Sequence, residues 1–136
     1  MIQKGPNLRD NARWDCPPVD WYKIKFDEAS KGNMGIVYCG VVIRDAYGEK
    51  VGCVAIPIGN WVNHVAEASA ALNGLIFAKS LNFRKVWVEG DSLNIINCLN
   101  KITKPSWTIS NIISWAINII NSFEMCIILH NFREEN

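Results

Sequence analysis

The feature that most constrains the fold of this chain is a change in hydrophobic periodicity near residue 60. Before that point apolar and polar residues alternate, which is the period of β-strands. The alternation predicts strands over Trp21–Asp27, Ile36–Asp45 and Lys50–Ile58. Because the links between these strands are short and contain glycine, we expect a three-stranded antiparallel meander.

The second half of the chain alternates helical and strand patterns. Apolar residues at helical spacing predict helices over Asn63–Leu81, Leu93–Leu99 and Trp107–Asn121. Short apolar runs predict strands over Lys85–Glu89 and Met125–His130. A meander followed by β-α-β units predicts an α/β fold, in which a mixed sheet is flanked by helices.

Chain length and proline positions indicate how the chain is divided. The 136 residues suit one domain with one hydrophobic core. Gly5-Pro6 and Cys16-Pro17-Pro18 disfavour regular structure near the N-terminus. We therefore expect a leader or linker over residues 1–20 and the folded domain over residues 21–136.

Composition argues against several classes of protein. The formal net charge is only +1, so any nucleic-acid binding would need a local arrangement of charge. The five cysteines form no C-x-x-C pair, which argues against a zinc site. They favour reduced, buried thiols in an intracellular protein, in the nucleus or the cytoplasm. No apolar segment is long and unbroken enough for a membrane span. We also expect the protein to be a monomer.

Several aromatic and basic side chains can be assigned from their neighbours. Lys23 and Lys25 share one face of the first strand, where we expect an ordinary solvated surface. Most tryptophans lie in apolar stretches and are expected in the core, namely Trp21, Trp87, Trp107 and Trp115.

Three acidic residues occupy comparable positions in the predicted fold. Asp27 ends the first strand, Glu67 lies in the first turns of the long helix, and Asp91 follows a buried strand. Carboxylates gathered at one sheet edge repel one another, and a hard divalent cation such as Mg²⁺ or Mn²⁺ relieves that repulsion. Because the chain carries 13 acidic residues, an ordinary surface role for these three also stays open.

The chain resembles the ribonuclease H type I family, and most closely the plant domains related to retroelement reverse transcriptases. The resemblance rests on six stretches that occur in the order typical of the family. They are Trp14–Pro18 (WDCPP), Trp21–Asn33 (WYKIKFDEASKGN), Gly40–Asp45 (GVVIRD) with Gly48, Ala66–Gly74 (AEASAALNG), Val88–Ser92 (VEGDS) and His130–Asn136 (HNFREEN).

The resemblance implies both a fold and an activity. The implied fold is a five-stranded mixed sheet flanked by helices, with Asp27, Glu67 and Asp91 matching the metal-binding, catalytic carboxylates of the family. The implied reaction is Mg²⁺-dependent endonucleolytic hydrolysis of the RNA strand in an RNA–DNA hybrid. Family members read such a hybrid by its shape and its 2′-hydroxyl groups.

Further residues gain candidate roles from the same resemblance. Asn33, Asn63 and Ser92 match positions that contact nucleic acid, and His130 matches a histidine that assists proton transfer or product release. Each position also suits a purely structural role: a turn for Asn33, helix N-caps for Asn63 and Ser92, and a surface position for His130.

Two departures from the family pattern bear on activity. Glu28 replaces the glycine that usually follows the first carboxylate, which adds bulk and negative charge near a polyanion. The sequence given ends at Asn136, before the fourth carboxylate and the C-terminal helix that carries it. The leading hypothesis is therefore a hybrid ribonuclease, intact or impaired. The alternatives are a catalytically inactive nucleic-acid-binding module and a structural remnant of a retroelement.

Overall fold

The computed structural model describes residues 17–26, 30–32, 34–60 and 63–131, which form one mixed sheet and three helices. Asp27 and Asn33, both predicted site residues, lie outside the described residues. The strands are β1 (Tyr22–Phe26), β2 (Ser30–Lys31), β3 (Val37–Arg44), β4 (Lys50–Gly59), β5 (Lys85–Gly90) and β6 (Met125–His130). The helices are α1 (His64–Ser80), α2 (Leu93–Leu99) and α3 (Ser110–Ser122).

The five long strands are arranged in the order β4-β3-β1-β5-β6. Strands β1, β3 and β4 pair antiparallel, which confirms the predicted meander. Strands β1, β5 and β6 pair parallel, as the β-α-β pattern of the second half predicts. The two-residue strand β2, which pairs with β3, was not predicted.

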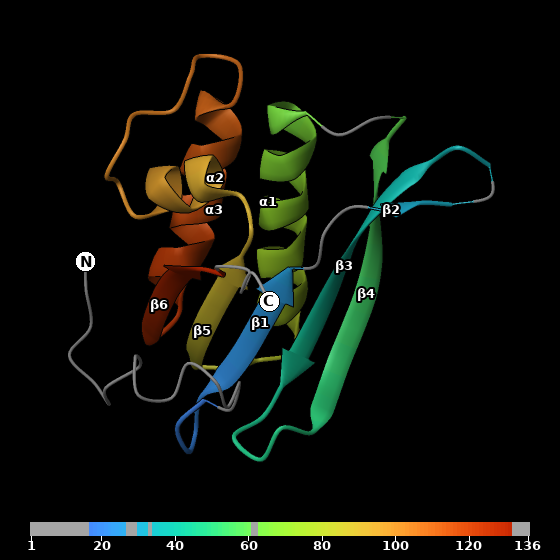
Figure 1. Ribbon diagram of the computed structural model, residues 1–136. Helices are drawn as coiled ribbons and strands as arrows, with labels where there is room; N and C mark the ends of the chain where they lie inside the picture. Colours follow the sequence, from blue (N-terminus) through green and yellow to red (C-terminus); the bar gives the residue numbers. More distant parts are fainter. Residues whose placement is uncertain (1–16, 27–29, 33, 61–62, 132–136) are drawn as a thin grey trace, which may run out of the picture.

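The three helices cover one face of the sheet, and the main core lies between them (Figure 1). Ile24 of β1, Val41 of β3 and Val88 of β5 point into this core and are at most 1% exposed. The strand β5 is buried on both faces, as the run Val86-Trp87-Val88 predicts. Within the described residues, no helix is long and apolar enough to cross a membrane.

Helix α1 lies close to the sheet because its buried face carries small side chains. Seven residues of this helix are buried, and six of them are alanine or glycine. A Cβ atom at Gly74 would lie 2.3 Å from Cε1 of Phe26, so only glycine lets this helix and β1 approach so closely. The contact fixes the middle of α1 against Phe26, the last residue of β1.

The opposite face of the sheet corrects one prediction. Lys23 lies there and is 3% exposed, whereas a solvated lysine was expected. Its Nζ atom is 3.3 Å from Oε2 of Glu89 and 5.5 Å from the ring centre of Trp87. Trp21, Trp87 and Ile127 form a second apolar cluster on this face, which confirms two of the tryptophans as buried.

Two other tryptophans are exposed, so their predicted core positions are wrong. Trp107 is 88% exposed and Trp115 is 56% exposed. Helix α3 begins at Ser110 rather than at Trp107, because the preceding residues form a turn in which the Ile109 N–H donates to Ser106 O (3.1 Å). The hydrophobic spacing in this region predicts the helix but not which side of it faces the sheet.

The cysteines in the part of the chain that the structure describes are not uniformly buried. Cys39 and Cys98 are buried, Cys126 is partly exposed, and Cys53 on β4 is exposed. The prediction of burial is therefore wrong for Cys53.

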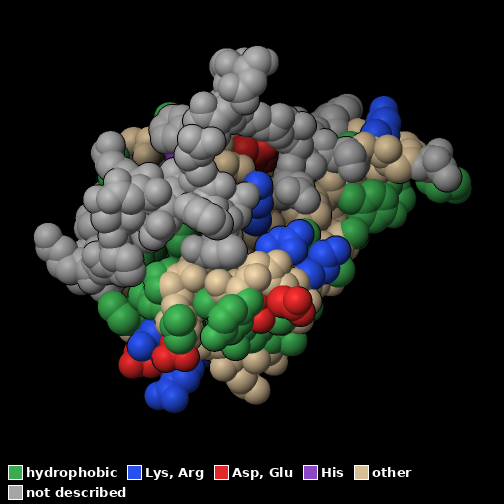
Figure 2. Space-filling model, turned by 60° about the horizontal axis from the view of Figure 1, so that its bottom comes forward, with side chains coloured by type: hydrophobic (Ala, Val, Ile, Leu, Met, Phe, Trp, Pro, Cys, Tyr) green, Lys and Arg blue, Asp and Glu red, His purple; other side chains and the backbone are tan. Residues whose placement is uncertain are grey.

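In Figure 2, basic side chains lie in small groups beside acidic ones on the described surface, in keeping with the near-neutral net charge.

Candidate metal and nucleic-acid site

Glu67 is positioned by the start of helix α1. The side-chain oxygen of Asn63 accepts a hydrogen bond from the Ala66 N–H at 2.8 Å and caps the helix, so the structural role considered for Asn63 is confirmed. Glu67 follows in the first turn, where the helix dipole favours a negative charge. The cap therefore sets the point on the helix from which this carboxylate extends.

Asp91 is positioned by the end of strand β5. This strand ends at Gly90, and its parallel register with β1 pairs Glu89 with Lys25. The ends of the two strands, Phe26 and Gly90, therefore lie at the same edge of the sheet. Asp91, the residue after Gly90, is exposed at this edge.

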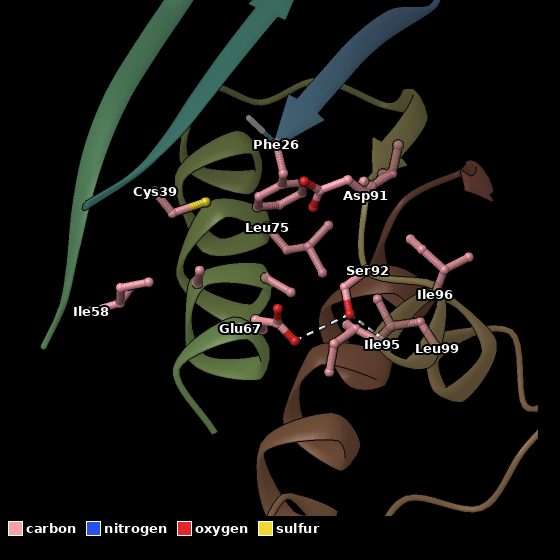
Figure 3. Close-up of a pocket in the computed structure, with 14 residues that line it drawn as sticks. Phe26, Cys39, Ile58, Glu67, Leu75, Asp91, Ser92, Ile95, Ile96 and Leu99 are labelled. Carbon is pink, nitrogen blue, oxygen red and sulfur yellow. Dashed lines mark hydrogen bonds between the residues drawn. The ribbon is translucent and has the colours of Figure 1, made fainter. Parts of the chain in front are cut away.

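Ser92 connects the two acidic segments. Its hydroxyl donates a hydrogen bond to Oε1 of Glu67 at 3.2 Å, across 25 positions of sequence (Figure 3). The same oxygen accepts from the Ile95 N–H at 3.4 Å and caps α2, so the capping role considered for Ser92 is also confirmed. The hydroxyl thus orients the Glu67 carboxylate and starts the helix that follows Asp91.

Glu67, Asp91 and Ser92 line one cavity between α1, α2 and the sheet (Figure 3). The cavity has a volume of about 230 Å³. Most of its lining is apolar, and Phe26, the last residue of β1, contributes to it. The remaining lining residues are Cys39, Ile58, Ala70, Ala71, Leu75, Val88, Gly90, Ile95, Ile96 and Leu99.

His130 ends strand β6 beside the acidic edge. Its Nε2 atom lies 3.2 Å from the backbone oxygen of Asp91, and the side chain is partly buried rather than on the open surface. The parallel register of β5 and β6 pairs Gly90 with His130 and accounts for this contact. The structure therefore brings together Glu67, Asp91, Ser92 and His130, while Asn63 lies at the start of the helix that carries Glu67.

The chemistry of the described donors fits a hard divalent cation. Glu67 and Asp91 supply carboxylate oxygens, which Mg²⁺ prefers. Among the described residues, no group of three or more His, Cys, Asp or Glu side chains is placed to hold a metal ion. Asp27, the third carboxylate that the sequence analysis expects at this site, follows Phe26 in the chain and lies outside the described residues.

The apolar cavity beneath the acids was not predicted from the sequence. Its walls include Ala70 and Ala71 of α1, whose short side chains leave space between this helix and α2. The run of alanines in α1 is visible in the sequence, but helix propensity alone explains alanine equally well.

Comparison with known proteins identifies the family. The model of the family described as "Reverse transcriptase-like" matches residues 25–136. A protein of Arabidopsis thaliana with the provisional name ribonuclease H protein is 30% identical over 131 residues, which are 96% of this chain. The chain spans 21% of the length of that relative.

Solved structures share the fold. Ribonuclease H1 of the archaeon Halobacterium salinarum is 25% identical, with a TM-score of 0.70 over 81% of this chain and 84% of that one. The LC11 ribonuclease H1 in complex with an RNA/DNA hybrid is 23% identical, with a TM-score of 0.67 over 80% of this chain and 83% of that one. This chain belongs to the reverse-transcriptase-like family of ribonuclease H-like domains and has the ribonuclease H fold.

Proposed function

We propose that this domain hydrolyses the RNA strand of RNA–DNA hybrids in a reaction that depends on Mg²⁺, with Mn²⁺ as a possible substitute. In this proposal Asp27, Glu67 and Asp91 hold the metal. The observation that carries it is the convergence of Glu67 and Asp91, from α1 and the end of β5, on one cavity that Phe26 also lines. Asp27 is the next residue of the chain after Phe26.

The relatives support the nucleic-acid substrate. The LC11 enzyme has been solved with an RNA/DNA hybrid, and a foamy viral protease-reverse transcriptase that shares this fold has been solved with double-stranded DNA and with an RNA/DNA hybrid. The near-neutral charge of this chain is compatible with such a substrate because shape and local contacts can supply recognition.

The described side chains have distinct proposed tasks. A divalent cation in this family of sites supplies positive charge that activates water and stabilises the leaving oxygen. Ser92 holds Glu67 in one orientation through its 3.2 Å hydrogen bond, which is the kind of support that ligand carboxylates require. His130 contacts the backbone of Asp91, and we assign to it the transfer of a proton at the acidic edge.

The polar residues around the acids would contact the backbone of the hybrid. Asn63 uses its side-chain oxygen as a helix cap, which leaves the amide N–H groups as donors to a phosphate. Ser92 already donates to Glu67, so we assign it mainly to positioning that carboxylate. Asn33 is proposed as a further contact on the basis of the family match.

Cleavage of a labelled RNA–DNA hybrid by the wild-type chain and by Asp91→Asn tests this function. We expect Mg²⁺-dependent cutting by the wild type and a loss of at least about 100-fold in the variant, because a neutral amide binds the cation far less well than a carboxylate. Glu124→Gln is the matched control, since Glu124 lies far along the chain in an exposed ion pair with Arg84. Equal cutting by wild type and Asp91→Asn would refute the proposal.

A second candidate function is nucleic-acid binding without catalysis. The observation in its favour is Glu28, which places a carboxylate where the family has glycine next to the first metal ligand. Binding to the hybrid that weakens as salt rises, in a wild-type protein that shows no Mg²⁺-dependent cutting, would support this function over the first.

A further inference from the structure

We propose that the cavity beneath Glu67 and Asp91 binds small amphiphilic cations, namely an aromatic ring joined by a short chain to an ammonium group. The ring would occupy the apolar part of the cavity, and the ammonium would lie at its acidic opening. This ligand site shares Glu67 and Asp91 with the metal site of the proposed function, but it requires neither a bound metal ion nor a nucleic acid.

The first observation is the shape and polarity of the space. The cavity measures about 230 Å³, which exceeds the roughly 150 Å³ of an apolar protein cavity known to admit benzene. Leu75 and Val88 form an apolar floor that is at most 1% exposed. Ala71, Ile96 and Leu99, which are 5–7% exposed, add further apolar lining.

The second observation is the distribution of charge at the opening. Asp91 is exposed and Glu67 is partly exposed, so both acids lie at the solvent side of the cavity. In the described part of the chain, ion pairs join Lys23 to Glu89 and Arg84 to Glu124, and neither pair involves these two acids. In the metal-free protein a neutral or anionic ligand would leave both carboxylates uncompensated, whereas an ammonium supplies the opposite charge.

The third observation explains why the space is not filled from within. Helix α1 presents Ala70 and Ala71 to the cavity, and α2 is anchored at its start by the Ser92 cap. Short side chains on one wall and a fixed helix on the other keep the gap open. A longer side chain at position 71 would therefore fill the cavity directly.

The test is a titration of the whole chain, with isoleucine methyl groups labelled for NMR, without nucleic acid or divalent cation. The probe is 2-phenylethylamine, which is protonated at pH 7 because its amine resembles that of lysine. We expect saturable shifts of the Ile58, Ile95 and Ile96 methyls with half-saturation at roughly 1 mM. The Ile102 methyl, which lies outside the cavity, should not move.

Two uncharged or oppositely charged ring compounds isolate the role of the ammonium. We expect 2-phenylethanol to bind about fivefold or more weakly than the amine, because it loses the charge-assisted interaction, and phenylacetate to bind more weakly still. Glu67→Gln should reduce the affinity for the amine but not for the alcohol. Equal affinity for all three compounds would overturn the proposal.

A filled cavity provides the second control. Ala71→Leu should abolish binding of the amine, whereas Ala55→Leu, an exposed alanine on β4, should leave it unchanged. If Ala71→Leu does not fold, the comparison of the three compounds on the wild-type chain still decides the matter. Absence of cavity methyl shifts at the highest soluble amine concentration, or saturable shifts in a folded Ala71→Leu variant, would overturn the proposal.

Discussion

Lys23 shows how a single residue can depart from the role its sequence position indicates. Strand alternation places it on the face opposite the helices, where lysine is normally solvated. Instead its ammonium is paired with Glu89 at 3.3 Å and lies over Trp87, and its side chain is almost completely buried. A charge in this setting depends on its partners, because burial without them is costly.

We predict that Glu89→Gln lowers the free energy of unfolding by about 2 kcal/mol, because a buried ammonium loses its charged partner. The double variant Lys23→Met with Glu89→Leu should recover a large part of this loss, since it removes both charges together. Urea unfolding of the variants followed by circular dichroism measures both values.

The exposed pair of Arg84 and Glu124 is the control for this prediction. Its side chains are 82% and 51% exposed, so solvent screens the 3.4 Å contact. We expect Glu124→Gln to change stability by less than about 0.5 kcal/mol. A loss as large as that of Glu89→Gln would show that burial is not what distinguishes the two pairs.

At the scale of elements, the approach of α1 to β1 positions the candidate site. Gly74 lies against Phe26, and Phe26 lines the cavity that Glu67 and Asp91 share. The helix also carries Glu67 in its first turn. A change in the distance between α1 and β1 would therefore move one acid relative to the edge of the sheet that carries the other.

We predict that Gly74→Ala destabilises the domain by roughly 1–2 kcal/mol. The added Cβ would lie 2.3 Å from Phe26 and 3.2 Å from Val41, so the ring must shift toward the cavity, and this cost exceeds the helix-propensity gain of about 1 kcal/mol. Asn73→Ala, at the neighbouring exposed position, should be neutral or stabilising. Urea denaturation compares the two, and a stabilised Gly74→Ala would contradict the close contact.

At the scale of the whole molecule, the described cysteines lie at different depths of the fold. Cys53 is on the exposed edge strand β4, whereas Cys39 and Cys98 are in the main core. Cys126 is partly exposed, but its apolar surroundings raise the pKa of its thiol from 9.0 to about 12, with burial as the main cause. Only deprotonated thiols react readily with alkylating reagents.

We predict that iodoacetamide at pH 8 modifies Cys53 rapidly and leaves Cys39, Cys98 and Cys126 protected until the domain opens. Peptide mapping by mass spectrometry with increasing urea measures each site. Rapid labelling of Cys39 in the native protein would contradict the core assignment.

Because the folded state raises the pKa of Cys126 above its unfolded value, the neutral thiol contributes stability below pH 9 that is lost as pH rises toward 12.

Much of the architecture follows from local pattern. The sequence predicts the last strand with the bounds that the structure shows, Met125–His130, and helix capping is one of the two roles that it offers for Asn63 and Ser92. It does not reveal that Lys23 is buried or that Trp107 is exposed, because periodicity assigns a face but not what lies against it. The candidate acids are also visible in the sequence, but the Ser92–Glu67 hydrogen bond that orients one of them joins distant segments.

The sequence by itself determined the order of the five long strands and the three helices, because the change from alternating to helical spacing encodes which backbone geometry buries the apolar side chains. Only the tertiary structure decided that Glu67, Asp91 and Ser92 line one apolar cavity and that His130 contacts the backbone of Asp91 beside it. The physical reason is that strand register and the packing of α1 on Phe26 depend on contacts between residues far apart in the chain, which no local pattern contains.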